Sequence, residues 1–267
     1  MKDILSRFKR QPDTEVLLPL LEQWFEGEAG QLMLRRQQGL VSEAITESFG
    51  YHLLQLSVDS RLHLFDESRV QNNYHCHPLA SNGNARCEFD QLPFASESLD
   101  VVLLHHVQEY VSNPHTLLRE VQRVVIPHGR LVIVGFNPWS ILGLYGQIAR
   151  FFPRSIWQNH SISPRRIKDW LSLLGFETQR CLFGYHNPAL MERSDKPLLK
   201  RLLKQWPLGG FYMISAIKKE AGMMPIKPSW KTAHKPFVGL TPVKPRATHH
   251  APIKKTLITP LREEDVA

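Results

Sequence analysis

The sequence predicts an α/β fold built on a mostly parallel sheet. Residues 99–104 and 130–136 are apolar, β-branched runs of strand length, and the segment between them repeats its apolar residues at helical spacing. A strand, a helix and a strand within about 40 residues form a βαβ unit, whose two strands run parallel. A chain of 267 residues with 42% hydrophobic content can bury a large core, so we expect one domain with an appendage.

The first third of the chain predicts helices followed by short strands. Residues 14–47 carry two helical patterns separated by Gly27 and Gly30, and we assign residues 1–49 to a helical lead-in. The apolar run 51–56 predicts the first strand, with Leu53 to Ser57 near the centre of the sheet. Residues 61–70 read as a brief helix, 73–79 as a weak strand and 85–89 as a third short strand.

Helix and strand signals are clearer in the second half. Asn113-Pro114 and Ser163-Pro164 each combine a capping residue with proline at the first helical position, so a helix begins at each. The first helix ends at the turn 127–129, before the strand 130–136. The second ends at Gly175, before a strand over 176–183, and the run 211–217 predicts a last strand.

The net charge of +8 is concentrated at the end of the chain. Residues 218–267 contain ten Lys or Arg and four acids, which is +6 of the total, together with seven prolines and no periodic pattern. Such a segment buries too little apolar surface to offset the entropy of ordering. We therefore expect a domain over residues 50–219 and a disordered basic tail over 220–267, which is a candidate arm for nucleic acid or another acidic partner and otherwise a solvated linker.

Several classes of protein are excluded by composition. The chain shows no signal peptide and no apolar run of the roughly 18 residues that cross a bilayer, so we expect a cytoplasmic protein with no membrane partner. The three cysteines lack CxxC spacing and predict reduced thiols. His75-Cys76-His77 reads as a plain strand without a third metal ligand, so no metal is expected.

Three motifs carry a resemblance to a known family. They are EFDQLPF at 88–94, SLDVV at 98–102 and PHGRL at 127–131. From about residue 51 to 218 the chain resembles the class I S-adenosylmethionine-dependent methyltransferases, in which an acid and a Leu-Pro-Phe step precede the fourth strand. The lead-in helices, GYHLL at 50–54 and GFNPWS at 135–140 are similar to the YafS-like bacterial branch.

The resemblance implies a Rossmann-like sheet of seven strands with helices on both faces and an antiparallel last strand at 211–218. It also implies S-adenosylmethionine as the cofactor and methylation of an acceptor, which is a transferase activity. By resemblance, the positions that contact the cofactor are Gln55, Leu56, Ser57, His77, Glu88, Phe89, Leu92 and His105. Glu88 stands where an acid meets the adenine amino group, and Leu92 where an apolar wall faces the ring.

The turn after the first strand departs from the family pattern. Gln55 replaces an acid, and Ser57, Asp59 and Arg61 stand where the family has glycines. Glycine allows positive φ and a close approach of the backbone. If Ser57 adopts such a conformation at a cost of about 1 to 2 kcal/mol, cofactor binding weakens about tenfold, and Ser57→Gly should strengthen it. His77 likewise replaces the acid expected to bind the ribose hydroxyls.

His105 and His106 are the candidate catalytic residues, because they leave the carboxyl end of strand 99–104, where ligands collect in open α/β sheets. A histidine there could accept a proton from the acceptor, although methyl transfer mainly needs in-line positioning. The alternative is that both line the pocket or pack. Asn137-Pro138-Trp139-Ser140 predicts a structural turn. Residues 137–162, with Trp139, Tyr145, Phe151, Phe152 and Trp157, predict an aromatic lid or, alternatively, a surface amphipathic segment.

The sequence thus favours a methyltransferase that uses S-adenosylmethionine on a small-molecule acceptor. The alternative is a non-catalytic protein that kept the fold as a binding or scaffolding module, with nucleic acid as a partner of its tail. A nicotinamide-dependent oxidoreductase is set aside, because the first strand lacks a GxGxxG turn. The oligomeric state is not indicated.

Overall fold

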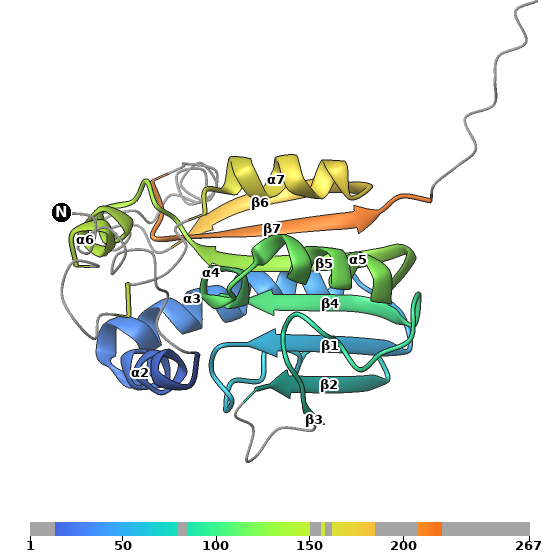
Figure 1. Ribbon diagram of the computed structural model, residues 1–267, viewed down its shortest axis with the longest axis horizontal. Coiled ribbons are helices and arrows are strands. Elements are labelled where there is room, and N and C mark those ends of the chain that lie inside the picture. Colours follow the sequence, from blue (N-terminus) through green and yellow to red (C-terminus); the bar gives the residue numbers. More distant parts are fainter. Residues whose placement is uncertain (1–13, 79–84, 150–155, 158–161, 185–207, 221–267) are drawn as a thin grey trace, which may run out of the picture. The chain divides into compact units, whose positions relative to one another are not determined.

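The computed structural model describes residues 14–78, 85–149, 156–157, 162–184 and 208–220 (Figure 1). All of them belong to the first of two units of the chain, Met1–Met223. The expected tail beyond residue 220, and Phe151 and Phe152 of the expected lid, lie outside the described residues. The domain limits drawn from the sequence, and the disorder expected of the tail, stay predictions.

A seven-stranded sheet forms the centre of the described part, in the order β3-β2-β1-β4-β5-β7-β6. Its strands are β1 (His52–Ser57), β2 (Asn72–His77), β3 (Ala85–Arg86), β4 (Leu99–His105), β5 (Val125–Phe136), β6 (Phe176–Gly184) and β7 (Phe211–Lys218). Strands β3, β2, β1, β4 and β5 run parallel, and β7 lies antiparallel between β5 and β6. The predicted mostly parallel sheet, with β1 near its centre and an antiparallel last strand, is confirmed.

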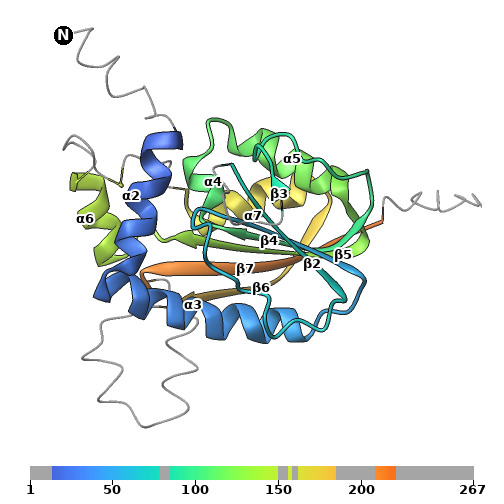
Figure 2. The same cartoon turned by 90° about the horizontal axis from the view of Figure 1, so that it is seen from below.

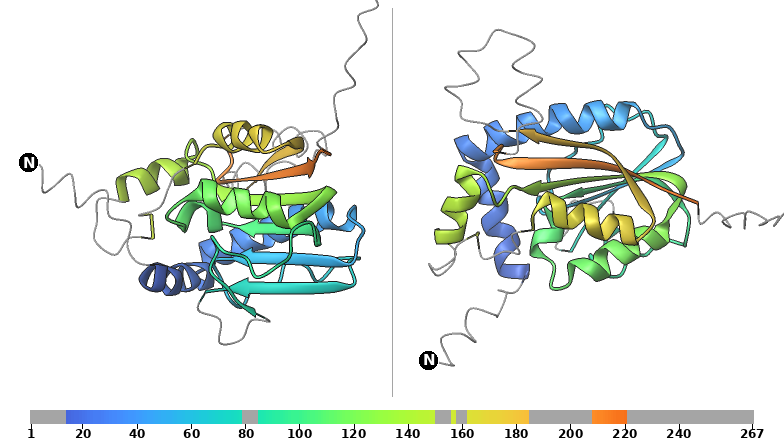
Figure 3. Two further views of the ribbon diagram at one scale, coloured as in Figure 1. Left: turned by 45° about the vertical axis from the view of Figure 1, so that its right-hand side comes forward. Right: turned by 90° about the horizontal axis from the view of Figure 1, so that it is seen from above.

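Helices cover both faces of the sheet. They are α2 (Thr14–Glu26), α3 (Glu28–Thr46), α4 (Val107–Tyr110), α5 (Pro114–Val124), α6 (Ile141–Ala149) and α7 (Pro164–Leu173). Helix α3 lies on one face, and α5 and α7 lie on the other (Figures 2 and 3). Helices α2 and α6 lie at the edge where β1, β4 and β5 end (Figure 1). That edge is where open α/β sheets bind ligands.

Local signals explain where these helices begin. The Asn113 Oδ1 accepts hydrogen bonds from the His115 and Thr116 backbone N–H groups, at 3.1 and 3.3 Å, so Asn113 caps α5 as predicted. The Ser163 Oγ caps α7 through the Arg166 N–H. The chain turns tightly between α2 and α3. The turn requires glycine at position 30, since a Cβ there would lie 2.3 Å from the Trp24 carbonyl oxygen. Gly30 therefore lets the two helices cross closely.

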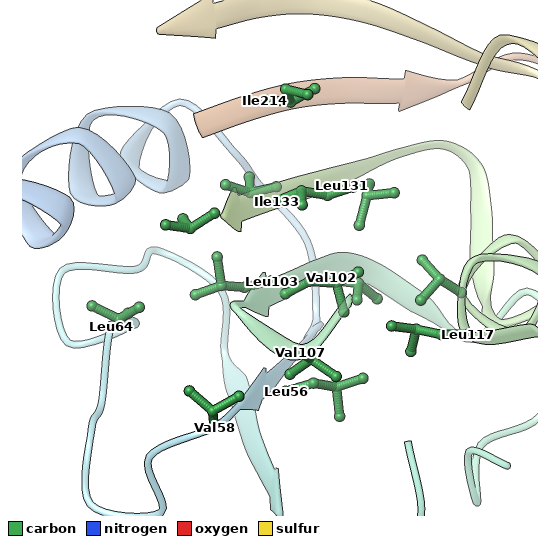
Figure 4. Close-up of a cluster of buried hydrophobic side chains, with 14 of the residues drawn as sticks. Leu56, Val58, Leu64, Val102, Leu103, Val107, Leu117, Leu131, Ile133 and Ile214 are labelled. Carbon is green, nitrogen blue, oxygen red and sulfur yellow. The ribbon is translucent and has the colours of Figure 1, made fainter. Parts of the chain in front are cut away.

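The core between the sheet and its helices is aliphatic. Leu103 of β4, Ile133 of β5 and Ile214 of β7 are fully buried on neighbouring strands, and Leu117 of α5 packs against this cluster (Figure 4). Each such side chain contributes about 1.5 to 3 kcal/mol on burial. The continuous apolar runs of β4 and β5 are explained by burial on both faces.

One expectation from the sequence was wrong. Residues 61–70 form no helix; the chain passes from β1 to β2 through an irregular loop.

The last strand ends where the resemblance implied, at Lys218, which is buried. Its Nζ donates to the carbonyl oxygens of Val125 at 2.7 Å and Gln122 at 2.8 Å, at the end of α5. The positive charge of Lys218 thus satisfies helix-terminal carbonyls.

Candidate functional site

The candidate site lies at the carboxyl ends of β1, β2 and β4. Ser57 and His105 are paired across β1 and β4 at this edge, and His77 is the last residue of β2. Helix α2 lies beside the same edge (Figure 2). The parallel register therefore brings together three of the residues that the sequence singled out.

The turn after β1 is held by hydrogen bonds to α2. The Ser60 N–H and Oγ–H both donate to the Glu22 Oε1, at 3.0 and 2.7 Å. The Arg61 guanidinium pairs with Glu26 of α2 and also donates to the Asp59 Oδ1. The Ser60 hydrogen bonds and the nearby Arg61 charge lower the pKa of Glu22 against the opposing effect of its burial. Helix α2 thus closes over the turn by specific polar contacts.

The glycine-like conformation expected of this turn is contradicted. Among the described residues, positive φ outside glycine occurs at Glu97, His106 and His128, and not at Ser57, Asp59 or Arg61. Ser57 is fully buried, and its Oγ accepts from the Asp59 N–H at 3.1 Å. The expected gain from Ser57→Gly rested on relieving strain that is absent, so it is withdrawn. That substitution would remove hydrogen bonds instead.

Gln55, which replaces the acid of the family pattern, is also fully buried. Its Oε1 accepts from the Leu64 N–H at 2.8 Å and its Nε2 donates to the Leu62 carbonyl oxygen. One amide side chain therefore fixes the loop that replaces the predicted helix. Leu56, beside it in β1, packs into the core (Figure 4).

A chain of buried polar side chains runs from the β1 turn to β5. The Ser57 Oγ lies 3.0 Å from the His105 Nδ1, and the His105 Nε2 lies 3.0 Å from the Gln37 Oε1. The Gln37 Nε2 then donates to the His106 Nε2 at 2.9 Å, and the His106 Nδ1 lies 3.1 Å from the Glu109 Oε2. The other Glu109 oxygen accepts from the Phe136 N–H at 2.5 Å.

The donors in this chain run in one direction. The Asp59 N–H donates to the Ser57 hydroxyl, which then donates to the His105 Nδ1, so His105 carries its proton on Nε2. The Gln37 Oε1 accepts from His105, and the Gln37 Nε2 donates to the His106 Nε2. His106 therefore carries its proton on Nδ1 and donates it to Glu109. Each neutral imidazole thus donates once and accepts once.

Burial fixes the protonation of these groups. It lowers the pKa of His105 to about 3, with the nearby His75 as a lesser cause, and it lowers the pKa of His106 well below its usual value. Burial also raises the pKa of Glu109 well above its usual value. Phe25 of α2 packs against both rings, at 5.6 and 5.7 Å between ring centroids. Both histidines are neutral and shielded from solvent in this arrangement.

Gln37 and Glu109 were not among the candidates from sequence. Gln37 lies on α3 with Met33, Leu40 and Val41, all buried on the same face. A polar residue on an otherwise apolar helical face was the available signal for Gln37. Glu109 follows His106 by three residues, but its other partner, the Phe136 N–H, comes from β5 and is not marked by any local pattern.

The segment between β3 and β4 provides a second group of candidates. Phe89 and Leu92 are buried, whereas Glu88 is exposed. The Phe89 ring lies 6.3 Å from the His77 ring at the end of β2. This arrangement leaves a free carboxylate beside an aromatic and aliphatic surface.

His75 of β2 has hydrogen-bonding capacity left over. It is fully buried, and both of its ring nitrogens lack a hydrogen-bond partner. Burial lowers the pKa of His75 to about 4, and His63 and His77 add to that effect. In the described part of the chain, no three potential ligands gather in a group that could hold a metal ion.

Comparison with known proteins gives a family match over part of the chain and several structures with the same fold. Residues 38–133 match the family described as methyltransferase domain. Two solved S-adenosylmethionine-dependent methyltransferases have the same fold. One, from Thermotoga maritima, is described as a possible histamine N-methyltransferase; it superposes with a TM-score of 0.56 at 16% identity and covers 77% of this chain and 99% of its own. The other, from Archaeoglobus fulgidus, has a TM-score of 0.53 at 18% identity and covers 74% of this chain and 98% of its own.

Residues 38–133 therefore match a methyltransferase domain, and the fold is shared with S-adenosylmethionine-dependent methyltransferases. The chain is also similar to the uncharacterized protein YafS of Escherichia coli, with 32% identity over 154 residues, which is 58% of this chain and 64% of YafS. The uncharacterized protein MJ1123 of Methanocaldococcus jannaschii is 25% identical over 129 residues, 48% of this chain and 60% of that protein. The matches span roughly three fifths of the length of these relatives.

The described residues fit one half of S-adenosylmethionine. The exposed Glu88 carboxylate can accept from an adenine amino group, and Phe89 and Leu92 can flank an apolar ring. The methionine half does not fit the β1 turn as it is folded, because the polar atoms of Gln55 and Ser57 are already paired within the protein. Glu88 is thus an exposed polar group on this segment, whereas the polar atoms of Gln55 and Ser57 are paired within the protein.

Proposed function

We propose that this chain is a methyltransferase that uses S-adenosylmethionine to methylate a small-molecule acceptor. The observation that supports this most is the seven-stranded sheet with its antiparallel β7. Residues 38–133 of the same chain also match a methyltransferase domain. The non-catalytic alternative gains no support from the comparisons.

The adenosine half of the donor would lie on the segment between β3 and β4. Glu88 would accept from the adenine amino group, Phe89 and Leu92 would contact the ring, and His77 would donate to a ribose hydroxyl. When bound, the donor's sulfonium would supply the methyl group. We assign no described residue to the methionine half, because the candidates Gln55 and Ser57 are paired internally.

His105 and His106 stay candidates for the catalytic role. Their contacts favour a positioning role, because both rings are buried, neutral and paired on each side by the Gln37 amide and its neighbours. This agrees with the chemistry, since methyl transfer from a sulfonium depends mainly on in-line placement of the acceptor. The acceptor itself would be chosen by the loops after β4 and β5. A cytoplasmic location and a nucleic-acid arm remain predictions.

Calorimetric titration of the full chain with S-adenosylmethionine tests this proposal. Glu88→Ala should weaken binding by roughly tenfold or more, because a charge-assisted hydrogen bond contributes about 1.5 to 3 kcal/mol. Asp90→Ala is the matched control: Asp90 is also exposed, two residues further on, and its loss should leave the affinity unchanged. If the parent protein fails to bind at millimolar concentration, the enzyme proposal is wrong. If the parent protein binds S-adenosylmethionine tightly and Glu88→Ala does not change the affinity, the protein binds the donor but the assigned site is wrong.

A further inference from the structure

Helix α6 buries its small residues and exposes most of its large apolar ones. Its small residues Gly143, Gly146 and Ala149 face the protein, at spacings of three. Four of its large apolar residues, Ile141, Leu144, Tyr145 and Ile148, face solvent, whereas Leu142 packs partly against the core. An amphipathic helix on a soluble domain shows the opposite arrangement, with large apolar residues buried.

Packing explains why the small residues face inward. A Cβ at Gly146 would lie 2.6 Å from the Trp157 ring, and one at Gly143 would lie 2.1 Å from the Asn137 carbonyl oxygen. Trp157 in turn packs against Phe136 of β5 and Trp24 of α2. The helix therefore rests directly on an aromatic ring, and no larger side chain fits at Gly143 or Gly146 without a shift of its neighbours.

The start of α6 is fixed by the turn that the sequence predicted. The Asn137 Nδ2 donates to the Gly209 carbonyl oxygen at 2.8 Å, and the Asn137 Oδ1 accepts from the Trp139 N–H. The Ser140 Oγ accepts from the Gly143 N–H at 2.9 Å. The outward orientation of α6 is thus built into the fold.

The outer face forms an apolar ridge, which we define as Trp139, Ile141, Leu144, Tyr145 and Ile148. These side chains are between 60% and 83% exposed. Single exposed apolar residues are ordinary, but a contiguous set of this size marks an interaction surface. Residues 137–149 contain no charged residue. The ridge therefore offers nothing but apolar and weakly polar groups to its partner.

The surroundings of the ridge indicate the kind of partner. Helix α7 follows β5 and α6 and packs back along the sheet, so it begins at the same edge as α6, and its first turn carries the exposed Arg165 and Arg166. Tryptophan and tyrosine beside aliphatic residues, with arginine nearby, are typical of segments that lie in the interface of a bilayer. Residues 1–217 carry only +2 of the net charge, so the positive charge at this edge is that of Arg165 and Arg166, which is complementary to anionic head groups.

We propose that the ridge docks this protein on an anionic lipid surface, with α6 lying in the interface and Arg165 and Arg166 at the head groups. This is peripheral contact, and it revises the expectation of no membrane partner. No helix among the described residues has the length and apolar character needed to cross a bilayer. A second copy of the chain is the rival occupant. Vesicle binding and the oligomeric state, measured together, distinguish these two occupants.

Sedimentation of the full chain with vesicles tests the proposal. The vesicles consist of phosphatidylcholine alone or mixed with phosphatidylglycerol. The test variant is Ile141→Gln, Leu144→Gln and Ile148→Gln, since glutamine keeps helix propensity. Its control is Phe49→Gln, Tyr51→Gln and Leu173→Gln, which changes three other exposed apolar residues that lie before β1 and at the end of α7.

We expect the parent protein and the control to bind the mixed vesicles, and the test variant to bind at least tenfold more weakly. The difference should persist at about 0.5 M salt, where purely electrostatic attraction of the basic tail is screened. Equal binding of parent and test variant, or no binding of the parent, would overturn the proposal. So would a parent dimer that the test variant converts to monomer without any vesicle binding. None of these outcomes depends on cofactor binding.

Discussion

At the scale of single residues, the candidate site is defined by buried polar groups that satisfy one another. Gln37 joins His105 and His106 through both ends of its amide, and Glu109 completes the chain at the Phe136 N–H. A buried polar network of this kind specifies one arrangement only when every member is paired. The network makes the stability of the fold sensitive to pH, because neither histidine can be protonated without losing one of its hydrogen bonds.

The pH dependence of stability provides a test at this scale. Burial lowers the pKa of His105 from its ordinary value of 6.5 to about 3 in the folded protein. Between those values the unfolded chain binds a proton that the folded chain does not, so stability falls as pH falls from about 6.5 toward 3. We expect His105→Gln to make that slope shallower by about 1.4 kcal/mol per pH unit. Urea unfolding across this range measures the slope, and identical slopes for both proteins would contradict the assignment.

At the scale of elements, the loop between β1 and β2 distinguishes this chain. Where the sequence predicted a helix over residues 61–70, the Gln55 amide instead binds the backbone at Leu62 and Leu64. The turn before it is fastened to α2 through Glu22 and Glu26. These side-chain contacts therefore hold α2, the β1 turn and the loop after it together.

Gln55→Leu tests the role of that amide. The substitution roughly keeps the side-chain volume but leaves the Leu62 carbonyl and the Leu64 N–H without their partner. We expect a loss of about 2 to 4 kcal/mol in the free energy of unfolding, since each buried unpaired group costs about 1 to 3 kcal/mol. Gln38→Leu, at an exposed position of α3, serves as control and should change stability by less than about 0.5 kcal/mol. A loss no larger than that of the control would show that the loop is held by other contacts.

At the scale of the whole molecule, the fold was predictable and much of the site was not. The apolar runs of β4 and β5 and the caps at Asn113 and Ser163 are local signals, so they predicted elements correctly. The pairing of Gln37 with His105 joins residues 68 positions apart, and no local pattern encodes it. The sequence showed that the β1 turn lacks glycines, but the expectation of positive φ at Ser57 was wrong, because the turn has no residue with positive φ.

The most direct measurement of the central claim is hydrogen–deuterium exchange of the full chain with and without millimolar S-adenosylmethionine. The claim is that the donor's adenosine half binds at the carboxyl ends of β2 and β3, on the segment that follows β3. We predict slower exchange over residues 74–78 and 85–94 when the donor is present, and no change over β6 and α7. Unchanged exchange throughout the chain, or protection confined to β6 and α7, would contradict it.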